Sequence, residues 1–136
     1  MPKFGAESLK QLATCHPDLQ VVMNEVIKYI DFSVLEGHRG QSAQEAAFAA
    51  GNTKLHWPNG KHNKFPSFAV DIAPYPLNWK DTERFVYFAG FIMAIAKMLL
   101  AQGKITHEVR WGGDWDKDTQ VKDESFRDYG HFELVV

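Results

Sequence analysis

The segment FAVDIAP at residues 68–74 decides how this chain folds. Its apolar residues predict a strand over Phe68–Ala73, which Pro74 closes. Asp71 falls in the middle of this strand, where an isolated carboxylate is costly to bury unless it is paired or bound to a metal ion. A role for Asp71 in capping the turn before Pro74 is the alternative. The segment therefore predicts a piece of sheet and places a candidate polar site on it.

Helices are predicted on both sides of this segment. We expect a short helix over Glu7–Thr14, and Pro17 suits the first turn of a second helix. The apolar residues of that second helix recur at helical spacing: Leu19, Val22, Val26 and Ile30. Glycines follow two further expected helices, one over Ser42–Ala50 and one from Asp81 to Gln102. The chain is therefore rich in helix outside the predicted strand.

Three more strands are expected, at Phe32–Glu36, Val109–Trp111 and Phe132–Val136, with long polar loops over 52–67 and 112–128. Helices segregated from a small, mostly antiparallel sheet define an α+β class. A length of 136 residues suits a single domain that covers residues 1–136.

Composition excludes several classes of protein. Fifteen Lys+Arg against seventeen Asp+Glu give a net charge of −2, so no basic excess indicates nucleic acid or an anionic membrane as a partner. A single cysteine, Cys15, excludes an internal disulfide framework and a cysteine-based zinc finger. The first residues lack the apolar region of an export signal. The apolar stretch Phe85–Ala96 is too short to span a membrane, so we expect a buried core helix there.

Two histidines are candidate partners for Asp71. His62 lies in the polar loop nine residues earlier, and His131 opens the last strand. Two imidazoles and one carboxylate suit zinc with an open fourth position, which is the arrangement of a catalytic site. Asp128 is the candidate base for an attacking water molecule, because the turn that follows it can bring it beside His131. Arg39 is the candidate contact for a developing oxyanion.

Each of these residues also has a less specific interpretation. An isolated histidine is more often a hydrogen-bonding residue than a ligand, Arg39 is placed to pair with Glu36, and Asp128 is compatible with one more solvated charge. The loop around Asp128 is acidic enough to suggest calcium, although it lacks EF-hand spacing; its other carboxylates are Asp114, Asp116, Asp118, Asp123 and Glu124. We assign surface or capping roles to His16, His56 and His107, and a place on a groove wall to Trp115.

Five segments, in order along nearly the whole chain, resemble the small zinc peptidases that cut bacterial cell-wall peptides. This family contains the phage L-alanyl-D-glutamate endopeptidases (endolysins), the D-alanyl-D-alanine carboxypeptidases and the vancomycin-resistance dipeptidases. The segments are FG at 4–5 through QLAT at 11–14 and HPDL at 16–19, EGHR at 36–39, KH at 61–62 with AVDIAP at 69–74, RWGGDW at 110–115, and DYGHFEL at 128–134. Two departures are Lys61, where the commoner family pattern has serine, and eight residues instead of six between His62 and Asp71.

The resemblance implies the architecture of the D-alanyl-D-alanine carboxypeptidases and hedgehog-like domains, with a zinc site at the sheet. It implies that His62, Asp71 and His131 bind Zn²⁺, that Asp128 is the catalytic base, and that Arg39 contacts substrate and oxyanion. An aspartate base is typical of the endolysin branch, whereas the dipeptidases use glutamate. The resemblance therefore favours an endopeptidase.

The implied function is a zinc-dependent peptidoglycan hydrolase that cleaves between L-alanine and D-glutamate of the stem peptide and lyses the host cell. The alternatives are a D-alanyl-D-alanine carboxypeptidase, a non-catalytic zinc-stabilised wall-binding module and, third, a calcium-binding interaction protein. We expect a monomer with no nucleic-acid or membrane partner and no separate wall-binding domain. Without an export signal, it is expected in the host cytoplasm before release, after which it acts on the cell wall.

Overall fold

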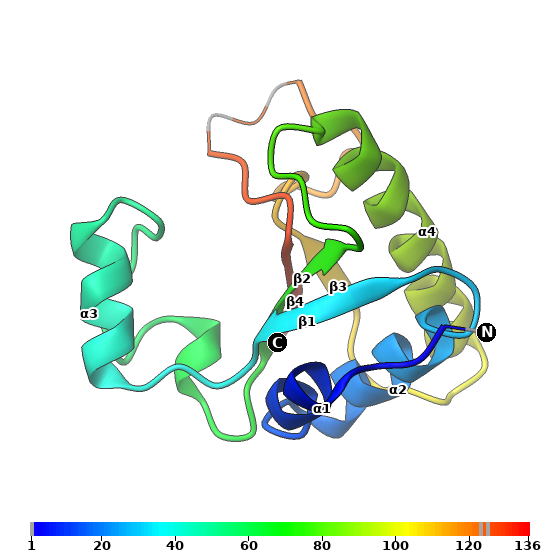
Figure 1. The fold of residues 1–136 in the computed structure, drawn as a ribbon, viewed down its shortest axis with the longest axis horizontal. Helices are drawn as coiled ribbons and strands as arrows, with labels where there is room; N and C mark the ends of the chain where they lie inside the picture. The colour runs from blue at the N-terminus through cyan, green and yellow to red at the C-terminus, as the bar shows by residue number, and fades with distance from the viewer. Residues whose placement is uncertain (1, 123, 125) are drawn as a thin grey trace.

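The computed structural model describes residues 2–122, 124 and 126–136. Its elements follow the order α1 (Ala6–Leu12), α2 (Pro17–Val26), β1 (Phe32–Glu36), α3 (Gln41–Ala49), a short 3₁₀ turn η1 (Lys61–Asn63), β2 (Ala69–Pro74), α4 (Thr82–Ala101), β3 (Val109–Trp111) and β4 (His131–Leu134). Figure 1 shows α1, α2 and α4 gathered near the sheet, while α3 lies apart from them. Every helix and strand predicted from the sequence is present, and most ends differ by no more than two residues. The exception is α2, which ends at Val26, four residues before the expected Ile30.

The four strands form one antiparallel sheet in the order β1-β2-β4-β3. The α+β class with a small antiparallel sheet is therefore confirmed. The last strand is shorter than expected, since β4 begins at His131 and ends at Leu134. The edge strands of the sheet are thus β1 and β3, and β2 and β4 are the two central strands.

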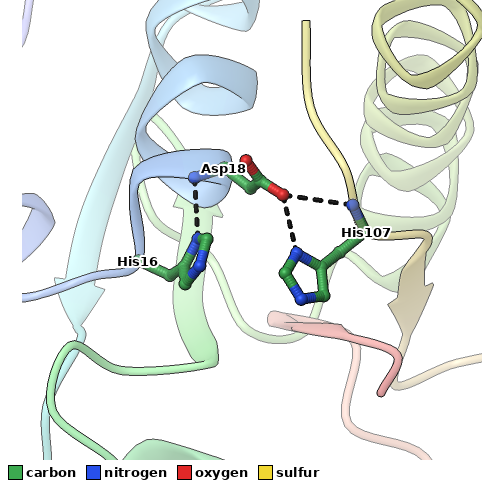
Figure 2. Close-up of side chains that lie close together, drawn as sticks. All are labelled: His16, Asp18 and His107. Atoms are coloured by element: carbon green, nitrogen blue, oxygen red, sulfur yellow. Dashed lines mark hydrogen bonds and ion pairs between the residues drawn. The ribbon is translucent and has the colours of Figure 1, made fainter. Parts of the chain in front are cut away.

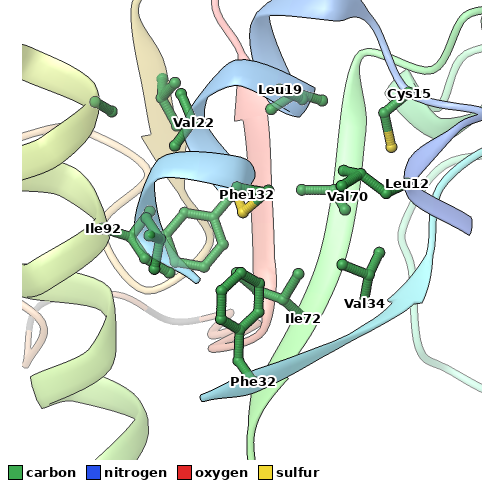
Figure 3. Close-up of a cluster of buried hydrophobic side chains, with 14 of the residues drawn as sticks. Leu12, Cys15, Leu19, Val22, Phe32, Val34, Val70, Ile72, Ile92 and Phe132 are labelled. Atoms are coloured by element: carbon green, nitrogen blue, oxygen red, sulfur yellow. The ribbon is translucent and has the colours of Figure 1, made fainter. Parts of the chain in front are cut away.

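The apolar face of the sheet carries the core. Successive side chains of a strand point to opposite faces, and those of Val70, Ile72, Phe132 and Leu134 are completely buried. Figure 3 shows residues of α2 and α4 packed against this face. Full burial of one such aliphatic or aromatic side chain stabilises a fold by about 1.5–3 kcal/mol. This packing determines which face of the sheet is left for polar residues.

The long helix α4 begins and ends where the sequence predicts. The side chain of Asp81 accepts a hydrogen bond from the backbone N–H of Arg84 at 3.2 Å, and Gly103 adopts a φ of +73° just beyond the last turn. By length and composition alone α4 is apolar enough to cross a membrane. It instead packs on α2 and the sheet through its buried residues, which are Phe85, Phe88, Ala89, Ile92, Ala96 and Leu99. The predicted core helix is confirmed.

The opposite, polar face of the sheet is set by the register of its strands. Asp71 of β2 lies opposite His131 of β4, and Glu133 of β4 lies opposite Arg110 of β3. The pairing of β1 with β2 shifts between Val34 and Glu36, so that Glu36 becomes the partner of Asp71. Such a bulge inserts one residue and re-aims the next side chain. Four charged or titratable side chains and an arginine thereby come to one face.

Candidate metal centre

His62 reaches the polar face from the turn η1. Its ring is almost completely buried, with 4% of the residue exposed. Nδ1 lies 2.7 Å from the carbonyl oxygen of Gly37, and Nε2 lies 3.2 Å from Oδ1 of Asp71. A Cβ at Gly37 would lie 2.2 Å from the hydroxyl of Thr14, so only glycine lets this carbonyl approach so closely. The backbone of the EGHR segment therefore orients the first imidazole.

His131 approaches the same carboxylate from the neighbouring strand. Its Nδ1 lies 3.2 Å from Oδ1 of Asp71, and its Nε2 lies 2.8 Å from Oε1 of Glu133. The rings of His62 and His131 are 5.1 Å apart at an angle of 68°. Asp71 does not cap the turn before Pro74; its carboxylate faces the two imidazoles. We call His62, Asp71 and His131 the sheet cluster.

The donor atoms of the sheet cluster fit a divalent cation. One atom from each residue lies within 4.8 Å of the others. Each imidazole turns one nitrogen to an acceptor outside the cluster, so its second nitrogen can offer a lone pair toward Asp71. Two such nitrogens and a carboxylate oxygen form a set that zinc binds with a fourth position open. A divalent metal is therefore compatible with the residues present.

The electrostatics of the sheet cluster support the same conclusion. Burial opposes ionisation of Asp71, but the facing His62 and His131 outweigh it and hold the pKa of Asp71 far below its usual range. Burial likewise disfavours a charged His131, yet the carboxylates of Asp71 and Glu133 raise the pKa of His131 to about 9. The negative charges of Asp71 and Glu133 thus favour a cation beside them, which is the proton of His131 when no metal is bound.

Asp128 lies beside the sheet cluster at the end of the loop that follows β3. Its backbone is tied to Gly112 by a hydrogen bond of 2.9 Å, and its carbonyl oxygen accepts the N–H of His131 at 3.1 Å. A Cβ at Gly112 would lie 2.3 Å from that carbonyl oxygen, so the close approach requires glycine. Burial and the negative charge of Asp71 raise the pKa of Asp128. A carboxylate in this environment is well suited to accept a proton.

Arg39 forms the ion pair expected with Glu36 and also lies next to Asp71. Its Nε donates to Glu36 at 2.9 Å, which is the predicted ion pair, and its NH2 group lies 3.4 Å from Oδ2 of Asp71. Its NH1 group donates to the side-chain oxygen of Gln44 at 3.1 Å. Only 12% of the Arg39 side chain is exposed. The guanidinium is therefore fixed at the edge of the sheet cluster by groups from β1, β2 and α3.

These residues line a cleft of about 300 Å³. Its walls include Arg39, His62, Asp128 and His131 together with Trp115, the predicted groove residue. Residues 52–55 and 59–62 of the long polar loop form another wall. Gln44, which is buried, ties this loop to α3 by donating to the carbonyl oxygen of Leu55 at 2.7 Å. Four of the five sequence-predicted site residues thus line one cleft, and the fifth, Asp71, lies within hydrogen-bond distance of His62 and His131.

A second group of two histidines and one aspartate lies at the start of α2, and we call it the α2 cluster. Figure 2 shows its residues, which are His16, Asp18 and His107. Nδ1 of His16 accepts the backbone N–H of Asp18 at 2.9 Å and so caps α2. Oδ2 of Asp18 lies 2.7 Å from Nδ1 of His107 and accepts the backbone N–H of Thr106 at 2.9 Å. The expected capping role of His16 is confirmed.

The acidic loop forms a third group of carboxylates. Asp114, Asp116, Asp118 and Glu124 bring one oxygen each to within 4.8 Å of one another. Some of these oxygens accept backbone N–H groups of the same loop, such as that of Thr119 on Asp114 at 2.9 Å. Asp123, which the sequence also placed in this group, lies outside the described residues. The grouping leaves calcium binding as an alternative interpretation of this loop.

The sequence analysis did not single out Glu133, although it belongs to the DYGHFEL segment. A signal was present, because in residues 131–134 polar and apolar side chains alternate, and residues two apart in a strand share a face. Glu133 therefore had to lie on the same face as His131. The identity of its other partners depends on which strand lies alongside.

Comparisons with known proteins match nearly the whole chain. The family model described as "Phage L-alanyl-D-glutamate peptidase" matches residues 1–135. The L-alanyl-D-glutamate peptidase of Escherichia phage T5 is 36% identical over an alignment of 144 positions, which covers 98% of each chain. The crystal structure of the L-Ala D-Glu endopeptidase ChiX of Serratia marcescens superposes with a TM-score of 0.73 at 25% identity, covering 98% of this chain and 90% of that one.

Proposed function

Because the chain belongs to the phage L-alanyl-D-glutamate peptidase family, we propose that it is a zinc-dependent peptidoglycan endopeptidase of the endolysin type. The bond cleaved is the one between L-alanine and D-glutamate in the stem peptide. This assignment of the bond comes from the relatives, which are named for that activity. The coarser property, a peptidase that acts on bacterial cell wall, follows from the same relationship.

The observation that carries the proposal is the convergence of five side chains from four separate parts of the chain on one site. The sheet cluster provides three candidate ligands, and Asp128 and Arg39 line the adjoining cleft. A purely structural zinc site has four protein ligands and no need of a nearby base. The arrangement therefore supports catalysis over a role in stabilising the fold.

Zinc held by His62, Asp71 and His131 would polarise the scissile carbonyl group and make an attacking water molecule more acidic. Asp128 accepts the proton of that water and passes it to the leaving amine, as its raised pKa favours. Arg39, already positioned by Glu36 and Gln44, donates to the oxygen on which negative charge develops. The low exposure of these groups keeps bulk water from screening the charges.

The cleft itself supplies the recognition of substrate. Trp115 lies on one wall, with its ring 5.5 Å from that of His131, and residues 52–55 form part of the other. We propose that the domain binds the stem peptide here as a monomer. It would remain in the host cytoplasm until the membrane is breached.

Digestion of purified cell wall, followed by mass spectrometry of the muropeptides, tests this function. We expect products that end in a newly freed L-alanine carboxyl group, loss of activity with a chelator and recovery with zinc. Loss of a single terminal D-alanine would identify a D-alanyl-D-alanine carboxypeptidase instead. Wall binding without any cleavage, combined with unfolding on chelation, would indicate a non-catalytic module.

A further inference from the structure

We propose that Glu133 is a positioning residue of the metal centre, which orients His131 through the ring nitrogen that faces away from the metal. The inference rests on the proposed function, because it concerns the ligand that the proposed zinc ion would use. Nothing in the comparisons assigns a role to this residue.

The geometry of β4 places Glu133 directly behind His131. The two residues are two positions apart on one strand, so their side chains share the polar face. Oε1 of Glu133 lies 2.8 Å from Nε2 of His131, while Nδ1 of the same ring faces Asp71. Only 5% of Glu133 is exposed. A buried carboxylate this close to an imidazole accepts its N–H and leaves the other nitrogen for the metal.

Two cations hold the second oxygen of Glu133. Arg110, opposite it on β3, donates from NH2 to Oε2 at 2.6 Å, and Nζ of Lys61 lies 3.2 Å from the same oxygen. The guanidinium of Arg110 is itself held over the ring of Trp115 at 5.7 Å, and Lys61 also donates to the carbonyl oxygen of Leu134. Oε2 therefore serves the two cations and Oε1 is left for His131.

Both imidazoles face Asp71 because each has an acceptor for its other ring nitrogen. His62 gives its outer nitrogen to the carbonyl oxygen of Gly37, and His131 gives its outer nitrogen to Glu133. Lys61, which helps to hold Glu133, directly precedes His62 in the turn η1. The supports of the two ligands are thus joined through adjacent residues. Outer partners of this kind raise the basicity of a ligand and fix its ring.

Zinc affinity of the Glu133→Gln variant, measured by competition with a chelator, tests the inference. Glutamine has one acceptor oxygen, for which Arg110 and Lys61 compete with His131, so we expect zinc affinity to fall about 10- to 100-fold. Glu108→Gln is the matched control. Glu108 is exposed, and its carboxylate pairs with Nζ of Lys117 at a distance of 2.7 Å. Neither residue belongs to the metal centre. The zinc affinity of Glu108→Gln should equal that of the wild type.

Exchange of the Nε2–H proton of His131 with water, measured by NMR on the zinc-bound protein, separates positioning from simple loss of charge. We expect faster exchange in Glu133→Gln than in the wild type. Weaker zinc binding with unchanged exchange would overturn the inference, as would an affinity within about twofold of the wild type. Should Glu133→Gln not fold, Lys61→Met serves instead: faster exchange supports the inference, and unchanged exchange and affinity contradict it.

The same titration on the wild-type protein distinguishes a failure of the proposed function from a failure of the role of Glu133. A wild-type protein that binds no zinc would defeat the proposed function. A wild-type protein that binds zinc and cleaves cell wall, beside a Glu133→Gln variant with the same zinc affinity, would defeat only the role of Glu133.

Discussion

The sheet cluster and the α2 cluster contain the same three residue types, two histidines and an aspartate, and differ in where their lone pairs point. In the sheet cluster, both imidazoles face Asp71 with one nitrogen and an outside acceptor with the other. In the α2 cluster, the backbone and its own members occupy the candidate ligand atoms. His16 accepts a backbone N–H, and Oδ2 of Asp18 accepts from Thr106 and His107.

Two clusters of the same composition can therefore differ in whether they are suited to bind a metal ion. A ligand must offer a lone pair that no internal donor has already taken, and its proton must have another acceptor. In the α2 cluster, Nδ1 of His16 and Oδ2 of Asp18 already accept backbone N–H groups. We therefore interpret the α2 cluster as a fastening between α2 and the segment before β3. The sheet cluster is the one we propose for zinc.

Alanine at the equivalent histidine of each cluster gives the largest expected contrast. His131→Ala should lose its bound zinc and, with it, several kcal/mol of transition-state stabilisation, so that wall cleavage falls by more than about 10³-fold. His107→Ala should keep one zinc ion per chain and its activity, as measured by metal analysis and turbidity of a wall suspension. Loss of zinc from His107→Ala would break the distinction between the clusters.

The Asp128→Asn variant tests the role of the base separately from that of the metal ion. Asp128→Asn keeps the size of the side chain but cannot accept the proton, so we expect kcat to fall about 10²- to 10⁴-fold with zinc affinity unchanged. Single-turnover cleavage of a muropeptide and chelator competition measure the two quantities. Asp31→Asn, at an exposed position, is the control and should change neither. Full activity of Asp128→Asn would contradict the proposed mechanism.

Asparagine at Asp18 tests the structural role of the α2 cluster. The side chain accepts the backbone N–H groups of Thr106 and His107 as well as the hydroxyl of Thr106. We expect Asp18→Asn to lower the free energy of unfolding by about 1–3 kcal/mol, the cost of weakening buried charged hydrogen bonds. Zinc affinity should not change. Glu25→Gln, which removes an exposed ion pair with Lys28, should leave the free energy of unfolding nearly unchanged.

The pH dependence of stability gives the smallest and most specific effect. Burial alone would raise the pKa of Asp18, but hydrogen bonds from His107 and Thr106 outweigh it and hold the pKa below its usual value. A depressed folded-state pKa stabilises the protein above the unfolded pKa, and the contribution is lost as pH falls through the folded pKa. Urea unfolding should show the gap between wild type and Asp18→Asn at neutral pH and a narrowing gap below about pH 4. A gap that does not depend on pH would refute this account.

Much of the fold was predictable from local patterns. The helix α4 begins after the capping carboxylate of Asp81 and ends before the left-handed Gly103, as the sequence analysis predicted. These ends were predictable because caps and terminal glycines act within one helical turn. The strand through Asp71 was predictable from its apolar residues. The bulge in β1 was not, because it arises from the pairing of two strands and leaves no local signature. Without this shift, Glu36 would not lie opposite Asp71.

The candidate site was predictable as a set of residue types and family segments, but not as a set of contacts. The grouping of His62, Asp71 and His131 in space agrees with the prediction, whereas their roles remain a proposal. Sequence alone also offered His16 and His107 near an aspartate and assigned them only general roles. The hydrogen-bond directions that separate the two clusters depend on ring orientation, which packing controls.

The helices, the strands, the α+β class and the family could all be predicted from the order and periodicity of residues along the chain. The tertiary structure decided which face of the sheet became polar, which strands lie beside Asp71, and that Glu133, Arg110 and Lys61 stand behind His131. The reason is that side-chain direction in a sheet depends on register, and register is set by the burial of the opposite, apolar face.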